Sequence, residues 1–185
     1  MKNPYEIIYA DPPWWYYGDP NKMAAAGKHY NLMKTPDICA LKVDSIAAKD
    51  AALFLWATSS KMPDAIEVMK AWGFHYRGVS HVWVKTRRDG GIIHGMGVRP
   101  TVTKPTTEFV LVGTRRKTGR PFKLLTENQG QVVLAPREEH SKKPDVFRDN
   151  IVELFGNRKR IELFARQASP GWDVWGNQVK SKVVI

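Results

Sequence analysis

The chain has 185 residues and a net charge of +11, with 43% hydrophobic residues, 25% charged residues and a single cysteine. A chain of this size suits one well-buried domain, residues 1–185, and its composition excludes both an internal disulfide framework and a membrane span, which needs about 18 consecutive apolar residues. The N-terminus has no signal-peptide pattern and the lone cysteine fits a reducing compartment, so we expect a cytoplasmic protein, and the excess of cations indicates a polyanionic partner.

Short apolar segments predict six β-strands, and helical patterns lie between several of them. In chain order, the predicted elements are a strand at 5–10, a weak helix at 37–50, a strand at 52–57, a helix at 59–73, strands at 81–85, 108–113 and 131–135, a helix at 142–156 and a strand at 160–165. Several strands are nearly continuous apolar runs, which is typical of strands buried on both faces. This alternation predicts an α/β fold with a mostly parallel central sheet flanked by helices.

The two stronger helices carry start and stop signals. Each has a proline near its start and a glycine at its end, as is usual for helix boundaries. In 59–73 we expect Ser60 to cap the first turn and Ile66 to face inward. In 142–156 we expect Leu154 on the buried face, since it continues the apolar spacing of one helical side.

The first predicted strand runs directly into Asp11, Pro12, Pro13 and Trp14. In open α/β sheets ligands collect at the carboxyl ends of strands. The prolines fix φ and donate no hydrogen bond. One carboxylate, the proline carbonyls and a flat ring together match an exocyclic amine on a planar heteroaromatic ring, such as an adenine flipped out of its stack.

The same corner has a structural alternative, which is a strand end bounded by prolines with its tryptophans in the core. The neighbouring Trp15, Tyr16 and Tyr17 fit packing and substrate contact about equally well. We expect the four residues 11–14 to be catalytic, and we leave the three that follow undecided between the two roles.

Positive charge is concentrated between Lys85 and Arg120, where nine cations stand against two acids, Asp89 and Glu108. The run contains glycine and proline, which indicates loops rather than a helix face. Such a cluster is either a solvated basic face or a nucleic-acid contact. We expect substrate-binding loops around 86–107 and 115–123. The predicted nucleic-acid-binding residues are Lys85, Arg87, Arg88, Arg99, Lys104, Arg115, Arg116 and Lys117.

Several motifs in one order give the chain a family resemblance. They are "ADPPW" at 10–14, "LFLWATSSKMPDAIEVMKAWGF" at 53–74, "WVKT" at 83–86, "KKPDVF" at 142–147 and "RKRIELFARQASPGWDVWGNQ" at 158–178. The chain resembles the DPPW-type adenine-N6 methyltransferases, which are named after the seventy-kilodalton subunit of the mRNA adenosine methyltransferase. This resemblance covers nearly the whole chain.

The resemblance implies a Rossmann-like methyltransferase fold that uses S-adenosylmethionine, with the catalytic motif ahead of the cofactor motif. It also implies which residues bind the cofactor: Asp11, Lys143, Glu162, Arg166, Asn177 and Gln178. In this reading Lys143 lies near the methionine carboxylate or the target base, and Glu162 takes the ribose hydroxyls. An acid that closes a strand is a usual ribose partner in such sheets, whereas the alternative for Glu162 is a surface acid paired with Arg158 or Lys159.

Two departures from the family pattern affect the cofactor site. Where eukaryotic members carry a His-Asn pair after the arginine, this chain has Gln167, Ala168 and Ser169. Those members also hold the cofactor's adenine with a segment upstream of the catalytic motif, and here only ten residues precede Asp11. The residues that hold the adenine are therefore not identified by the resemblance.

The expected substrate is adenine in nucleic acid, with DNA favoured over RNA because short members from bacteria and their phages are mostly linked to DNA. The alternatives are an RNA methyltransferase and a non-catalytic subunit that keeps the fold. Metal-dependent hydrolysis finds little support, because the five histidines show no close pair at ligand spacing, and no metal site is expected. We expect no membrane association, and the sequence does not distinguish a monomer from a homodimer.

Overall fold

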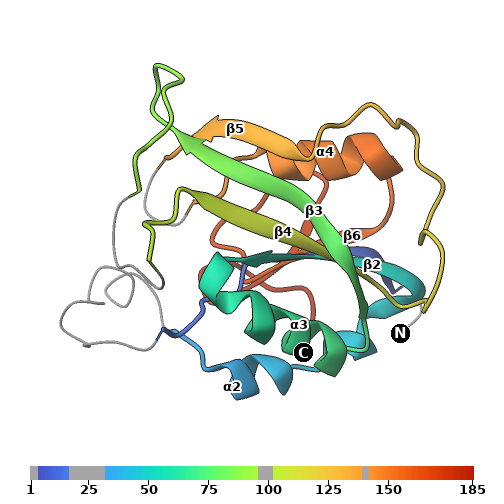
Figure 1. Cartoon of the computed structure of the whole chain (residues 1–185). Coiled ribbons are helices and arrows are strands. Elements are labelled where there is room, and N and C mark those ends of the chain that lie inside the picture. The colour runs from blue at the N-terminus through green and yellow to red at the C-terminus, as the bar shows by residue number, and fades with distance from the viewer. Residues whose placement is uncertain (1–3, 17–31, 96–101, 139–141) are drawn as a thin grey trace.

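A computed structural model of the chain describes residues 4–16, 32–95, 102–138 and 142–185 (Figure 1). Its centre is a seven-stranded sheet in the order β5-β3-β4-β2-β1-β6-β7. The strands are β1 (Tyr5–Ala10), β2 (Ala47–Ala57), β3 (His75–Thr86), β4 (Thr107–Thr114), β5 (Val132–Pro136), β6 (Arg160–Leu163) and β7 (Asp173–Trp175).

The sheet is mostly parallel, as predicted. Strand β4 alone is antiparallel to its neighbours, β2 and β3, while β1, β2, β6 and β7 are parallel to one another and β3 is parallel to β5. The carboxyl ends of β1, β2, β6 and β7 therefore lie beside the start of β4. We call this row of strand ends the carboxyl edge. The end of β4 lies at the opposite edge, which we call the amino edge.

Helices cover both faces of the sheet. Helices α2 (Thr35–Cys39) and α3 (Met62–Ala71) pack on one face, and α4 (Val146–Phe155) packs on the other (Figure 1). Neighbouring residues of β1 alternate between the two cores: Ile8 belongs to the core under α3, and Tyr9 to the core under α4. This alternation explains the continuous apolar runs, because each strand contributes both of its faces to a core.

The predicted elements are found, with shifted boundaries. Strands β2 and β3 extend several residues further toward the N-terminus than predicted, and β7 was not predicted. The segment 37–50 is not one helix. It contains the end of α2, a 3-10 turn at Val43–Ser45 and the start of β2.

Two expectations about the helices are wrong, those for Ser60 and Ile66. Ser60 does not cap α3, because a 3-10 turn at Ser59–Lys61 precedes the helix and no side chain caps its first turn. Ile66 is 38% exposed, so it faces solvent, whereas Leu154 is half-buried and packs against the core under α4 as expected. Within the described residues, no helix has the length and apolar character needed to cross a lipid bilayer.

Candidate active site

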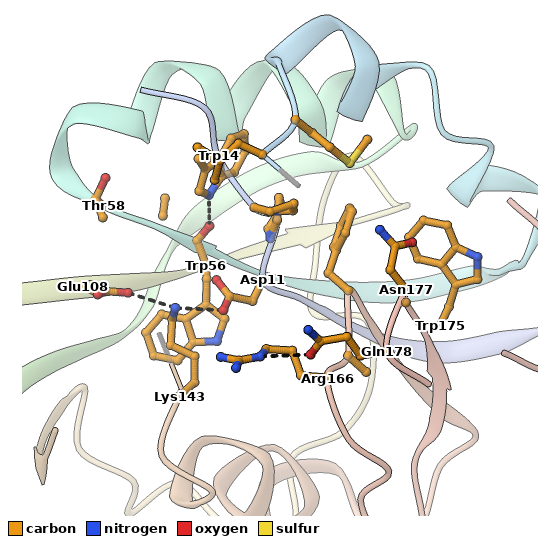
Figure 2. A pocket seen from close by; sticks show the side chains of 18 of the residues that line it. Asp11, Trp14, Trp56, Thr58, Glu108, Lys143, Arg166, Trp175, Asn177 and Gln178 are labelled. Atoms are coloured by element: carbon orange, nitrogen blue, oxygen red, sulfur yellow. Dashed lines mark hydrogen bonds and ion pairs between the residues drawn. The ribbon is translucent and has the colours of Figure 1, made fainter. Parts of the chain in front are cut away.

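A cavity opens at the carboxyl edge of the sheet (Figure 2). Its lining comes from the residues that follow β1, β2, β6 and β7, from the start of β4 and from the segment that leads into α4. Asp11, Lys143, Arg166, Asn177 and Gln178 all line it. The fold therefore brings together predicted residues that are up to 167 positions apart in the sequence.

The corner after β1 is held by backbone hydrogen bonds. The Trp14 N–H donates to the Pro12 carbonyl at 2.8 Å, and the Met33 N–H donates to the Pro13 carbonyl at 2.8 Å. Each proline oxygen thus has one backbone donor and keeps a second lone pair. The corner is rigid, and each proline carbonyl has only one lone pair left to accept a hydrogen bond from a ligand.

Trp14 offers the cavity only a small part of its ring. The side chain is 5% exposed, and its indole N–H donates to the Trp56 carbonyl at 3.1 Å. Tyr16 also lines the cavity and is half-buried, with its hydroxyl 3.1 Å from the Thr58 hydroxyl. The predicted broad stacking face at Trp14 is therefore largely covered, whereas Tyr16 presents more of its ring.

Four alternating charges form a chain across the cavity. The Lys143 ammonium lies 2.8 Å from Asp11 Oδ2 and 3.2 Å from the Glu108 carboxylate, whose other oxygen is 2.5 Å from Lys85. The ammonium of Lys143 also lies 5.2 Å from the centre of the Trp56 ring. The Lys143 side chain is 11% exposed and that of Glu108 16%. Lys143 is therefore held by two carboxylates and a ring at once.

The pKa values follow from this arrangement. Burial raises the pKa of Asp11, and the nearby Lys143 opposes that rise without cancelling it. Burial also acts on Glu108, but Lys143 and Lys85 hold its pKa below the ordinary value. For Lys143, the two carboxylates outweigh burial and raise the pKa. Lys143 is therefore protonated and Glu108 ionised at neutral pH, and Asp11 is the member whose charge state responds most readily to acid.

The MT-A70 family matches residues 5–178. The chain belongs to the MT-A70 family.

Individual MT-A70 relatives resemble the chain over most of its length. A Type II methyltransferase of a Mycoplasma species, M.MunI, is 35% identical over 95% of this chain and 78% of its own length. The human N(6)-adenine-specific methyltransferase METTL4 is 26% identical, and the human N(6)-adenosine-methyltransferase catalytic subunit METTL3 is 29% identical, each over 95% of this chain. This chain spans only 37% and 28% of those two human proteins.

Glu162 stands apart from the other MT-A70 site residues. It does not line the cavity; its carboxylate lies 3.0 Å and 3.1 Å from Arg148 Nη1, on the face covered by α4. Burial raises the pKa of Glu162 to about 7, with Arg148 opposing the rise. Its partner is neither of the two cations considered from the sequence.

The predicted nucleic-acid-binding cations divide between two opposite edges of the sheet. Lys85, Arg87, Arg88 and Lys104 lie at the carboxyl edge beside the cavity, while Arg99 falls outside the described residues. Lys85 is tied to Glu108, and Arg87 to Asp89 at 3.2 Å. Arg88 and Lys104 are exposed, so these two present their charge to solvent beside the cavity.

Arg115, Arg116 and Lys117 follow the end of β4 and lie at the amino edge, at the opposite ends of the strands from Asp11. Strand β4 separates them from Glu108 by roughly 20 Å, at about 3.3 Å per residue. Arg116 forms a bidentate pair with Asp50 at 2.6 and 2.7 Å, and the Arg115 guanidinium lies 5.7 Å from the centre of the Phe74 ring. The structure does not bring this group to the cavity.

Sequence reasoning missed several residues that line the cavity. Glu108 was counted only as one of two acids in a basic run, although an acid at the start of a buried strand was a usable signal. Thr58, Phe164 and Trp175 were not singled out. Within the described ranges, no group of three or more His, Cys, Asp and Glu side chains is placed to hold a metal ion.

Proposed function

We propose that this MT-A70 protein transfers a methyl group from S-adenosylmethionine to the exocyclic N6 amine of adenine in nucleic acid, with DNA preferred over RNA. The observation that carries the proposal is the hydrogen bonding of the two Asp11 carboxylate oxygens. Lys143 holds its Oδ2, and no group among the described residues donates to its Oδ1. The other carboxylate oxygen, fixed in direction at the end of β1, is left to accept a hydrogen bond inside the cavity.

An amine of adenine is a poor nucleophile, because its lone pair is delocalised into the ring. Asp11 Oδ1 can accept one amine hydrogen, and the second lone pair of the Pro12 carbonyl can accept the other. Two acceptors fixed in advance favour a pyramidal nitrogen and stabilise the positive charge that develops on it. Lys143 orients Asp11 and lowers the cost of burying its charge, which favours the ionised carboxylate against the effect of burial.

The lining of the cavity fits the cofactor. Lys143 can take a carboxylate, and Asn177 and Gln178 carry amides suited to ribose hydroxyls; Arg166 Nε donates to Gln178 Oε1 at 3.3 Å and orients that amide. When bound, S-adenosylmethionine would supply the electrophilic methyl group and leave as S-adenosylhomocysteine, while the methylated amine would lose one proton to water or to Asp11. The protein's own contribution is to position the amine, to accept its hydrogens and to exclude water around Asp11.

The preference for DNA is supported by similarity, since the identity to the Type II methyltransferase M.MunI is 35% and that to METTL3 is 29%. The chain covers 78% of the Type II methyltransferase M.MunI, but only 28% of the METTL3 subunit. The chain thus matches most of a short methyltransferase and only a minor part of the large subunit. A test incubates the purified protein with labelled S-adenosylmethionine and either DNA or RNA oligonucleotides, and then measures N6-methyladenine by mass spectrometry.

The expected result is N6-methyladenine in DNA, more slowly formed in RNA, and none in matched oligonucleotides that lack adenine. Product in RNA alone would reverse the substrate preference. Nucleic-acid binding without any methyl transfer by the protein alone would favour the alternative of a non-catalytic subunit.

The proposal predicts a loss of activity in acid. Asp11 must be ionised to accept the amine hydrogens, and burial raises its pKa, so kcat/KM is expected to fall as the pH is lowered through that raised pKa. The measurement is a pH profile between about pH 4.5 and 9. Glu162, with a pKa of about 7, titrates in the same range, so Glu162→Gln is the control. The Asp11 account is wrong if this variant abolishes the acid limb.

The salt dependence of DNA binding is expected to depend on the carboxyl-edge cations. Each lost phosphate contact reduces the slope of log affinity against log salt by about 0.7–0.9. Replacing Arg88 and Lys104 by alanine should therefore flatten the slope. Replacing Arg116 and Lys117 removes the same charge at the amino edge and should leave the slope unchanged. The opposite pattern would place the nucleic acid at the amino edge.

A further inference from the structure

Trp56, the next-to-last residue of β2, is hydrogen-bonded to the chain on both sides of Asp11. Its backbone carbonyl accepts the indole N–H of Trp14 at 3.1 Å, and its own indole N–H donates to the Tyr9 hydroxyl at 2.6 Å. Tyr9 lies two residues before Asp11, and Trp14 lies three residues after it. One residue of a neighbouring strand therefore ties together the two arms of the corner that carries the carboxylate.

The ring of Trp56 also lies against the Lys143 ammonium, whose nitrogen is over the ring at 5.2 Å from its centre (Figure 2). An ammonium has three N–H groups. Asp11 and Glu108 lie 2.8 and 3.2 Å from it, and an aromatic face is a further surface that attracts a cation, most strongly in tryptophan and in a desolvated site. The ring thus adds a third contact to the two carboxylates and limits where the ammonium can lie.

The Trp56 side chain is itself held in one orientation. The residue is 1% exposed, and the rings of Phe147 and Trp83 meet it edge to face, with their centres 4.8 and 6.1 Å away. Its indole N–H is committed to Tyr9, so a rotation of the ring would break a buried hydrogen bond and leave a polar group unpaired. The surface that Trp56 presents to Lys143 is therefore preorganised.

We propose that Trp56 is a positioning residue for the Asp-Pro-Pro-Trp corner, an inference that rests on the proposed methyl transfer. Its ring keeps the Lys143 ammonium on Asp11 Oδ2, so that Oδ1 stays directed into the cavity. Its two hydrogen bonds hold the strand before Asp11 and the tryptophan after it in one relative position. Trp56 acts through Lys143 and through the corner, and not through contact with the adenine.

The test makes the same substitution in two buried tryptophans. Trp56→Phe leaves a smaller ring and removes the N–H that fixes its orientation. Trp72→Phe is the matched control, because Trp72 is 0% exposed and donates its indole N–H to a backbone carbonyl at 2.9 Å, but packs in the core under α3 and does not line the cavity. Both variants should lose similar stability, whereas only Trp56→Phe should change the site.

The first measurement locates the ammonium and needs no activity. In protein labelled with ¹³C at lysine Cε, the NMR signal of Lys143 is assigned by its absence in Lys143→Met. The nearby ring displaces this signal through its ring current. We expect the signal to move toward the ordinary lysine position in Trp56→Phe and to stay in place in Trp72→Phe. An unmoved signal in Trp56→Phe would overturn the inference and leave the proposed function standing.

The second measurement is the pH profile of methyl transfer. A less well-placed Lys143 raises the pKa of Asp11 further, so the acid limb should move to higher pH in Trp56→Phe, with kcat at neutral pH about tenfold lower. The other charged groups that act on Asp11, which are Glu108, Arg166 and Glu162, are the same in both variants. The limb should not move in Trp72→Phe.

Equal losses of kcat in the two variants, with neither limb moved, would assign Trp56 a packing role alone and overturn the inference. If the unmodified protein transferred no methyl group, the proposed function would be wrong. The positioning role would then fall with it, even if the NMR signal showed that the ring holds the ammonium.

Discussion

Replacing Asp11 by asparagine is expected to reduce methyl transfer by about a hundred- to a thousandfold, the usual effect of removing one oriented electrostatic group from a catalytic site. Asparagine keeps the shape and can still offer an oxygen, but it loses the negative charge that stabilises the methylated amine. The affinity for S-adenosylhomocysteine should change far less, because Lys143, Asn177 and Gln178 remain in place. Initial rates and calorimetry on the same preparations separate the two effects.

Asp37→Asn provides the matched control for this experiment. Asp37 is exposed and lies in the first turn of α2, away from the cavity, so its loss should leave the rate unchanged. A near-normal rate for Asp11→Asn would remove the carboxylate from the mechanism. It would leave Pro12 and the rigid corner as the acceptors that position the amine.

Replacing Lys143 by methionine is expected to give the second large effect, on both activity and stability. The ammonium is the shared partner of Asp11 and Glu108. Its loss leaves Asp11 without its cation and brings two largely buried acids into mutual repulsion. Breaking a buried pair from one side costs about 3–5 kcal/mol, so thermal unfolding should begin roughly 10 °C lower.

The direction in which the stability of Lys143→Met changes with pH shows whether the loss comes from Asp11. Without Lys143 the pKa of Asp11 in the folded state rises further above its unfolded value, so the folded protein binds more protons than the unfolded chain. The stability of Lys143→Met should therefore fall as the pH rises through the interval between the unfolded and the folded pKa. Urea unfolding at several pH values measures this slope.

Two further variants complete the Lys143 experiment. Lys142→Met is the matched control, because Lys142 pairs with Glu138 and its side chain is 33% exposed. The double variant Lys143→Met with Glu108→Gln removes one of the two repelling acids and should recover part of the lost stability. Additive losses in the double variant would show that Lys143 and Glu108 do not act together.

The sequence predicted best those features that are local. Strand β1 and the Asp-Pro-Pro-Trp corner follow from an apolar run that meets two prolines, and both were predicted with the correct limits. Strand β7 was missed because its three residues are too few to form a pattern. The segment 37–50 was misjudged because its apolar spacing fits a helix, while pairing with β1 draws its last residues into β2.

The sequence misplaced Glu162 and Arg115. Their positions depend on which face of a strand a residue occupies and on the direction in which a strand runs, and the sequence alone did not specify either. Ile161 and Leu163 face the core under α3, so Glu162 between them must face α4 and Arg148. Recognising this alternation would have predicted that Glu162 points away from its neighbours' face. The position of Arg115 depends on β4 running antiparallel to the other strands, and no residue pattern in the strand signals its direction.

The pairing of β1 with both β2 and β6 has a consequence for biosynthesis. One edge of β1 stays without its partner until residues 160–163 have been made, and Arg166, Asn177 and Gln178 follow later still. A chain emerging from the ribosome therefore carries its Asp-Pro-Pro-Trp corner without a complete cavity around it until these residues have been made. The cavity is complete only when β6 and β7 have joined the sheet.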